Sequence, residues 1–190
     1  MMQTVTDIEK LREIAIDQHG YVTTSQAEEF GVSRPSLTYL VKNDRIDRIF
    51  RGIYRIPQIP ATPHDAMHLA LLWTDAEKAV LSHDTALDAW GVSDVNPTQI
   101  HATVPKGHRI NKAGGKNVIV HHQNITESQV GWWEQMPITK LSLTIEQCID
   151  RGLQSYLIRQ AIKNGRSRGM LSKDEADRLI NRLDSRNEKQ

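Results

Sequence analysis

A glycine flanked by two short helical patterns is the feature that most constrains the fold of this chain. Residues 25–30 have the composition of a short helix, for which Thr24 and Ser25 are candidate N-caps. Gly31 would end this helix, because glycine adopts a left-handed backbone without strain. Ser33 can cap a second helix that runs to about Asn43. Two short helices joined by a tight turn favour folds that pack such a pair against a further element.

The second helix has one apolar side and one polar side. Leu37, Leu40 and Val41 follow the i, i+3, i+4 spacing of a helix, so this side packs inward. The opposite side carries Pro35, Thr38, Tyr39, Lys42 and Asn43. Hydroxyl, amide and cationic side chains can hydrogen-bond to base edges and phosphates. The polar side is therefore the candidate surface for DNA recognition.

Two short strands follow the second helix. Residues 46–50 and 53–56 are rich in Ile, Phe and Tyr, with Arg51 and Gly52 at the bend between them. A capping box beginning at Thr6 predicts an earlier helix that would cover the helix pair. Three helices followed by a basic hairpin predict a winged helix-turn-helix, in which the second helix of the pair enters the major groove of DNA.

Positive charge is concentrated in the same stretch. Between Gly31 and Ile56 the chain has six Lys and Arg against two Asp, a local balance of +4, whereas the whole chain has a formal net charge of +1. The cations are Arg34, Lys42, Arg45, Arg48, Arg51 and Arg55. A local basic patch is the electrostatic footprint of a nucleic-acid-binding module. Similar helix and hairpin arrangements also occur in small domains that bind protein, so this alternative stays open.

A proline-rich segment divides the sequence. Its three closely spaced prolines resist both helix and strand, which predicts a linker over residues 58–63 between a DNA-binding domain, 1–57, and a second domain, 64–190. Within the second domain, helical patterns surround two alternating segments, 100–104 and 118–121, which a polar loop would join as a hairpin. The predicted fold class is α+β: a winged helix-turn-helix domain, then a mixed α/β domain with a small sheet and terminal helices.

The composition is that of a soluble globular protein. Apolar residues make up 38% of the chain, and the mean hydropathy is -0.50. No stretch has the apolar length of a membrane span, and the N-terminus has no apolar signal segment, so we expect a cytoplasmic protein with no membrane partner. The single cysteine, Cys148, excludes an internal disulfide framework. Its helix-like surroundings predict a buried structural thiol.

The sequence predicts no catalytic or metal site. His64 and His68 have the i, i+4 spacing of two ligands on one helix, but the residues between them lack the glutamate of a zinc-protease motif. His121 and His122 would point to opposite faces of a strand. Ser82–Asp84 are consecutive, and adjacency alone does not create a catalytic triad. We therefore expect no enzyme activity and no cofactor, and a metal-dependent hydrolase that uses the histidines is the weakest hypothesis.

Two further segments are basic. One is the polar loop between the alternating segments, and the other begins at Arg151 and holds ten Lys and Arg against five Asp and Glu. These segments could contact the DNA backbone or an acidic partner. For the C-terminal segment, favourable interaction with helix C-termini is an equally good interpretation. The candidate secondary contacts are Lys106, Arg109, Lys112, Lys116, Arg159, Lys163, Arg166 and Arg168.

Four segments carry a family resemblance. They are GYVTTSQAEEFGVSRPSLTYLVKNDRIDRIFRGIYRIP, VLSHDTALDAWGV, IHATVP and MPITKLSLTIEQCID. In this order, over about residues 11–180, they resemble the AbiEi family, which comprises antitoxins and transcriptional regulators of phage abortive-infection and type IV toxin-antitoxin systems. None of the four segments is a catalytic signature, so the resemblance is one of pattern and order.

The resemblance implies a winged-helix domain that binds double-stranded operator DNA, at inverted repeats upstream of its own gene, and represses the operon. It also implies a C-terminal domain that helps to neutralise a nucleotidyltransferase-like toxin, often without a stable complex. The DNA-binding residues that it implies here are Arg34, Ser36, Tyr39, Lys42, Arg48, Arg51 and Arg55. The alternative is a protein-interaction module that neutralises a partner by direct binding and has no operator.

Overall fold

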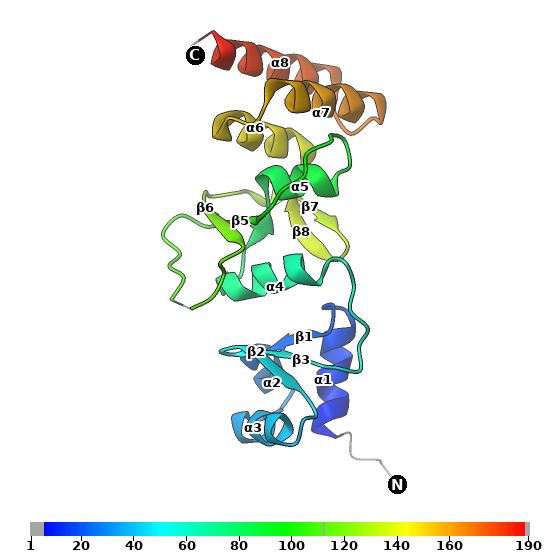
Figure 1. Ribbon diagram of the computed structural model, residues 1–190, viewed down its shortest axis with the longest axis vertical. Coiled ribbons are helices and arrows are strands. Elements are labelled where there is room, and N and C mark those ends of the chain that lie inside the picture. The colour runs from blue at the N-terminus through cyan, green and yellow to red at the C-terminus, as the bar shows by residue number, and fades with distance from the viewer. Residues whose placement is uncertain (1–5, 112, 189–190) are drawn as a thin grey trace. The chain divides into compact units, whose positions relative to one another are not determined.

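The structure is a computed structural model that describes residues 6–111 and 113–188. Over these residues the chain forms eight α-helices and two β-sheets, which confirms the predicted α+β class (Figure 1). The chain divides into two compact units. The first extends to Asp75 and includes described residues of Ile110–Gly114, and the second contains Ala76–Arg109 and the residues from Gly115 onward. No described helix is both long and apolar enough to cross a membrane.

The described part of the first unit contains four helices and three strands. They are α1 (Asp7–Ile16), β1 (Tyr21–Thr23), α2 (Thr24–Glu29), α3 (Arg34–Lys42), β2 (Asp47–Phe50), β3 (Ile53–Arg55) and α4 (Asp65–Thr74). The strands form an antiparallel sheet in the order β1-β3-β2. Buried side chains of the helices and the sheet, among them Leu11, Val22, Leu37 and Ile56, build one core. This core holds α3 and the β2–β3 hairpin in place.

Side-chain caps set the starts of the first two helices. The backbone N–H of Thr6 donates to Glu9 Oε2 at 2.7 Å, and α1 begins with the predicted capping box. The start of α2 differs from the prediction, because its N-cap is Thr23 rather than Ser25. Thr23 Oγ1 accepts the backbone N–H of Gln26 at 3.3 Å, and the side chain of Gln26 completes the capping box. β1, which the sequence pattern did not predict, ends at Thr23 and gives it the extended backbone that an N-cap requires.

Contacts of α4 attach this helix to the first unit. Arg55 Nη2 lies 3.3 Å from Asp65 Oδ2. The ring of His68, on α4, lies nearly parallel to that of Tyr21, with centroids 6.3 Å apart and 17° between the planes. The first compact unit therefore continues beyond the proline-rich segment at 58–63, because Arg55 and Tyr21 contact residues of α4, which follows that segment in the chain. The limits of the functional domains stay a prediction.

The described part of the second unit contains a five-stranded sheet and four α-helices. The elements are β4 (Val80–Leu81), α5 (His83–Ala89), β5 (Ile100–Val104), β6 (Val118–His122), the 3₁₀ helix η1 (Glu127–Gln129), β7 (Val130–Trp133), β8 (Met136–Thr139), α6 (Leu141–Arg151), α7 (Ser155–Ser167) and α8 (Lys173–Asn187). The strand order is β6-β5-β4-β8-β7. β5 and β6 are parallel, so the predicted hairpin is wrong. A parallel pair needs a connection of about a dozen residues or more, which the long polar loop supplies.

The helices of the second unit share a second core. α6, α7 and α8 lie next to one another, and α5 packs against α6 (Figure 1). Leu87, Ile145, Ile158 and Leu179 are fully buried among these four helices. Cys148 is buried there as well, as predicted, and burial raises the pKa of its thiol. The polar side chains of β5 and β6 are not part of this core.

Candidate nucleic-acid interface

α3 has the exposed face that its sequence predicts. Ser33 caps the helix by accepting the backbone N–H of Ser36 at 3.3 Å. Leu37 and Leu40 are buried, whereas Tyr39 has 66% of its surface exposed. The remaining exposed side chains of this face are Pro35, Thr38, Lys42 and Asn43. The amphipathic pattern of the sequence therefore gives the correct orientation of the helix.

The β2–β3 hairpin is attached to the start of α2. Its turn contains Arg51 and Gly52, and Gly52 has a φ of +78°. The backbone N–H of Thr24 donates to the carbonyl oxygen of Gly52 at 2.9 Å. A Cβ at Gly52 would lie 3.4 Å from Thr24 Oγ1, so glycine is favoured by both the backbone conformation and the close approach. This contact fixes the position of Arg51 beside α2.

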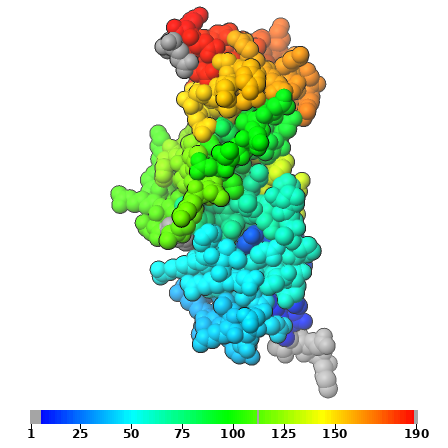
Figure 2. Space-filling model, in the orientation of Figure 1, coloured from blue at the N-terminus to red at the C-terminus, as the bar shows by residue number. Residues whose placement is uncertain are grey.

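A groove of about 560 Å³ is lined by α3, the start of α2 and the hairpin. It brings together four predicted residues, Arg34 and Thr38 from α3 with Arg48 and Arg51 from the hairpin. Figure 2 shows residues of α3 and the hairpin, in blue to cyan, on the visible surface of the first unit. The lining is Thr23, Thr24, Ser25, Arg34, Thr38, Arg48, Arg51, Gly52, Tyr54, Asp75 and Asn111. The sequence predicts Thr24 and Ser25 only as candidate helix caps, and it gives no role to Thr23.

The cations of the groove differ in their partners. Within the described residues, the side chains of Arg48 and Arg51 make no hydrogen bond or ion pair. Arg34 Nε donates to Glu28 Oε1 at 2.7 Å, and this hydrogen bond raises the pKa of Arg34. Because both side chains of this pair are well exposed, the pair is weak and water or an anion can replace either partner. The groove thus offers two free guanidinium groups and a third that is loosely held.

Arg55 faces the interior of the first unit instead of the groove. Only 16% of its side chain is exposed. Its Nη2 donates to Asp65 Oδ2 at 3.3 Å and to the Ile59 carbonyl oxygen at 3.2 Å, and its guanidinium carbon lies 5.6 Å from the centroid of the Tyr21 ring. The sequence analysis groups Arg55 with the other hairpin cations. The local pattern of the hairpin gives no sign that Asp65 on α4 supplies a carboxylate to Arg55.

Ser36 and Tyr39 lie at a second hollow of the first unit, of about 410 Å³. Two further cations line it, Arg12 from α1 and Arg45 from the segment after α3. The sequence gives no signal for Arg12, since α1 was predicted only as a support for the helix pair. Asn43 Nδ2 donates to the Tyr39 carbonyl oxygen at 2.8 Å. The side chain of Asn43 thereby closes the end of α3 close to Tyr39.

The secondary basic residues do not form one surface with a single role. Lys112 lies outside the described residues. Arg159 Nη2 lies 2.5 Å from Asp184 Oδ1, so this arginine joins α7 to α8. The others are exposed: Lys106, Arg109, Lys116, Lys163, Arg166 and Arg168. A contact of these exposed residues with DNA or an acidic partner stays a prediction.

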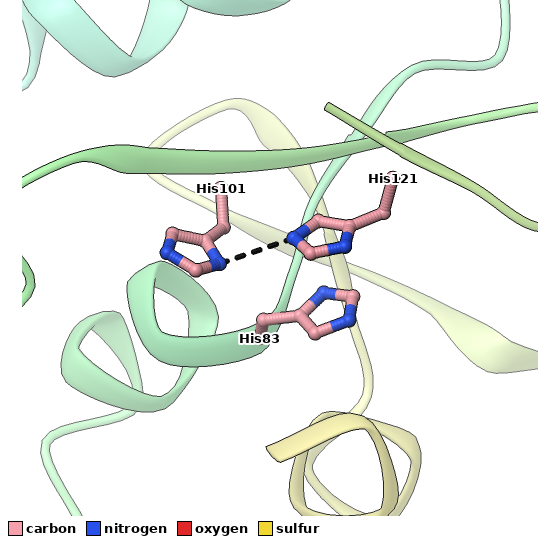
Figure 3. A group of neighbouring side chains, drawn as sticks. All are labelled: His83, His101 and His121. Carbon is pink, nitrogen blue, oxygen red and sulfur yellow. Dashed lines mark hydrogen bonds between the residues drawn. The ribbon is translucent and has the colours of Figure 1, made fainter. Parts of the chain in front are cut away.

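The structure also gathers three histidines that the sequence does not connect. One ligand nitrogen of each of His83, His101 and His121 lies within 4.8 Å of the others (Figure 3). They come from α5, β5 and β6, so no local spacing marks them. The available signal is the alternation within each strand, but the predicted hairpin is antiparallel and so does not give the parallel register that brings His101 and His121 together. Within the described residues, His64 and His68 belong to no such group.

Comparisons with known proteins agree with this arrangement. In fold the chain is similar to the RV2827C protein from Mycobacterium tuberculosis, with a TM-score of 0.54 and 15% sequence identity over 93% of this chain and 75% of that chain. No curated protein matches the sequence. Residues 9–57, which contain α2, α3 and the hairpin, match the family model described as transcriptional regulator, AbiEi antitoxin. Over these residues the chain matches this family model, which agrees with the resemblance given by the sequence.

Proposed function

We propose that the chain is a sequence-specific DNA-binding autorepressor and the antitoxin of a bicistronic toxin-antitoxin operon. In this proposal the first unit is a winged helix-turn-helix, α3 is its recognition helix and the β2–β3 hairpin is its wing. The observation that carries the proposal is the groove between α3 and the hairpin, where Arg48 and Arg51 are exposed and have no partner in the described part of the chain.

A DNA backbone fits this groove by charge and by hydrogen bonding. The guanidinium groups of Arg48 and Arg51 offer N–H donors to phosphate oxygens, and the hydroxyls of Thr23 and Thr24 line the same groove. Such contacts orient a protein on the duplex but carry no sequence information. Tyr39, on the exposed face of α3, is placed to contact base edges. The surface thus divides into a backbone-binding part and a base-reading part.

The regulatory and antitoxin roles follow from the family match. The description of that family names both a transcriptional regulator and an antitoxin, which supports a role in the control of a toxin-antitoxin operon. We therefore propose an operator of inverted repeats upstream of the gene, and a downstream gene for a nucleotidyltransferase-like toxin. The second unit contributes to neutralisation in this proposal, without the need for a stable complex.

Binding of the purified protein to the DNA directly upstream of its own gene tests the DNA-binding proposal. The assay is fluorescence anisotropy at several salt concentrations, with a shuffled duplex of the same composition as the control. We expect selective binding to the upstream duplex that weakens as salt rises, since phosphate contacts release counterions. Equal binding to both duplexes, or none, would contradict the sequence-specific function.

Substitution of Tyr39 tests the base-reading part. Tyr39→Ala should change the order of preference among single-base variants of the operator, by about 1–3 kcal/mol at the contacted base pair. Tyr156→Ala on α7 is the matched control, because it is the same substitution at a similarly exposed tyrosine outside the groove and α3. If Tyr39→Ala weakens binding equally for every variant, Tyr39 has a role in the general affinity only.

A second candidate function is direct neutralisation of a partner protein by the second unit. The observation that favours it is the exposure of two large aromatic side chains, Trp132 at 71% and Tyr156 at 68%. Aromatic residues are enriched at protein interfaces. Co-purification of the toxin with the chain, together with no binding to the upstream duplex, would support this function over the repressor.

A further inference from the structure

Three imidazole rings converge at one place in the second unit. His83 begins α5, His101 lies on β5 and His121 lies on β6. His121 Nε2 lies 3.2 Å from His101 Nδ1. The ring of His83 stacks on that of His121, with centroids 3.5 Å apart and 14° between the planes (Figure 3). The neighbouring strands and the start of a helix thus present one ring each to a common point.

We propose that His83, His101 and His121 bind a divalent transition-metal ion, for which Zn²⁺ is the best fit. Imidazole nitrogen is a favoured ligand of Zn²⁺, and three protein ligands leave a fourth position open. Two nitrogens on a tetrahedral zinc ion are about 3.3 Å apart, given zinc–nitrogen bonds of about 2.0–2.1 Å. The pair formed by His101 and His121 already has a separation of 3.2 Å. The ring of His83 completes the site by rotating out of its stack.

The sheet holds two of the ligands in place before any ion binds. In the parallel register of β5 and β6, Thr103 is opposite His121. His101 lies two residues before Thr103, so His101 and His121 share one face of the sheet. The backbone N–H of His101 donates to Thr85 Oγ1 at 2.8 Å, which ties β5 to the first turn of α5. This attachment brings His83 over the same face.

Burial keeps the three rings in the form that binds metals. Desolvation lowers the pKa of His83 to about 3 and that of His121 to about 4, and it also lowers the pKa of His101. Each ring is therefore neutral at pH 7 and has one nitrogen with a free lone pair. A bound ion would replace the hydrogen bond between His101 Nδ1 and His121 Nε2.

A hydroxyl pair can orient His83 toward the ion. His83 Nδ1 lies 2.9 Å from Ser82 Oγ, which accepts a hydrogen bond from Thr103 Oγ1 at 2.7 Å. Donation from Nδ1–H to Ser82 would leave Nε2 as the ligand, and metal-bound histidines commonly donate their second N–H in this way. His83 also has a φ of +51°. A non-glycine residue adopts this conformation at a cost, and such residues cluster at functional sites.

A cavity of about 470 Å³ gives an ion access to the cluster, and two of the three histidines line it. Arg151 and Arg182 also line this cavity. Arg151 Nη1 lies 2.6 Å from Asp84 Oδ2, and Arg182 Nη2 lies 2.7 Å from Asp150 Oδ1. Each arginine is paired with a carboxylate, which offsets part of the repulsion between its charge and a bound cation. Water or a small ligand from the cavity can fill the fourth position.

Titration of the untagged full-length protein with metal tests the site. After removal of metals with a chelator, we expect one Co²⁺ per chain, with the intense visible absorption of a four-coordinate site, and displacement of Co²⁺ by Zn²⁺. Zn²⁺ should also raise the Tm, because it binds the folded state. Failure of the wild-type protein to bind a stoichiometric ion would overturn the proposal without reference to any variant.

Three variants locate the site. His121→Gln should weaken Zn²⁺ binding by at least about 100-fold, and Ser82→Ala by about 10-fold, since it removes only the partner of a ligand. His122→Gln is the matched control, because His122 is the next residue on β6 and is exposed. We expect it to bind Zn²⁺ like the wild-type protein. Unchanged affinity of a His121→Gln protein with a native circular dichroism spectrum would overturn the assignment of these ligands.

Discussion

The basic segment 31–56 and the basic C-terminal segment that begins at Arg151 use their arginines differently. In the first unit, Arg48 and Arg51 are exposed at the groove and have no partner among the described residues. In the second unit, arginines of α8 are engaged by neighbouring helices, as in the ion pair of Arg182 with Asp150 on α6. The net charge of the C-terminal segment is the larger of the two, +5 against +4. Charge counts therefore do not distinguish a surface for a polyanion from a set of internal contacts, whereas the positions of the acceptors do.

The strongest test of this comparison uses two double variants, each of which removes two positive charges from one of the units. The double variant Arg48→Ala, Arg51→Ala should lose about 100-fold in affinity for the upstream duplex, and its salt slope should fall by about 2, because two phosphate contacts are lost. The matched double variant Arg178→Ala, Arg182→Ala removes the same charge from α8, where both arginines are ion-paired. It should bind DNA like the wild-type protein. Equal losses in the two variants would show a general charge effect and break the comparison.

The comparison extends to a buried histidine of the first unit, because neither ring nitrogen of His68 has a hydrogen-bond partner among the described residues. Burial lowers its pKa to about 4, whereas a histidine in the unfolded chain has a pKa near 6.5. Below pH 6.5 the unfolded state binds a proton that the folded state excludes. Stability should therefore fall as the pH decreases from about 6.5 to about 4, by up to about 3 kcal/mol for this group.

His68→Phe isolates that contribution. The variant keeps an aromatic ring beside Tyr21 but cannot take up a proton, so the decrease in Tm between pH 7 and pH 4.5 should be smaller than in the wild-type protein. Carboxylates contribute to acid sensitivity equally in both proteins. Equal decreases in Tm would show that protonation of His68 does not oppose folding.

Arg186 tests whether the α8 arginines stabilise the second unit. Its Nη1 donates to the carbonyl oxygens of Ile149 at 3.2 Å and Leu153 at 2.8 Å, at the C-terminal end of α6, and its Nη2 donates to Ser155 Oγ at 2.7 Å. Arg186→Ala should lower the free energy of unfolding by about 1–3 kcal/mol, because the Leu153 carbonyl oxygen and Ser155 Oγ lose their donor, whereas the Ile149 carbonyl oxygen keeps the backbone N–H of Gly152. Denaturant titration measures the loss, and anisotropy should show unchanged DNA binding. A variant of normal stability would contradict the internal role.

Local signals in the sequence predict much of this fold. The capping box that begins at Thr6 forms, and Gly31 ends the helical turn before α3 with a φ of +75°. These features depend on atoms within a few residues of one another, so the sequence contains all the partners. The exposed face of α3 is predictable for the same reason, since it follows from the periodicity of Leu37 and Leu40.

Features that depend on distant partners could not be predicted. The side chain of Arg55 is drawn inward by Asp65, and the local pattern of the hairpin does not contain that carboxylate. The histidine cluster exists because β5 and β6 pair in parallel, which brings His101 and His121 onto one face. Strand alternation gives the face of each residue within its own strand, but only the topology decides which faces are shared.

Glu28 offers the smallest and most specific test of the groove. Its carboxylate is the partner of Arg34 in an exposed pair, at 2.7 Å, so Arg34 lies between the free and the engaged arginines of the comparison. Glu28→Gln removes the negative charge and frees Arg34 for phosphate. Because exposed pairs contribute only about 0.2–1 kcal/mol, affinity for the upstream duplex should rise by at most about 5-fold.

Anisotropy at low salt measures the gain, and Glu29→Gln, on the next exposed residue of α2, controls for the change in net charge. An equal gain in both variants would mean that net charge, and not the release of Arg34, sets the affinity. A gain in Glu28→Gln alone would place the phosphate at Arg34 and extend the backbone-binding surface from the hairpin to the first turn of α3.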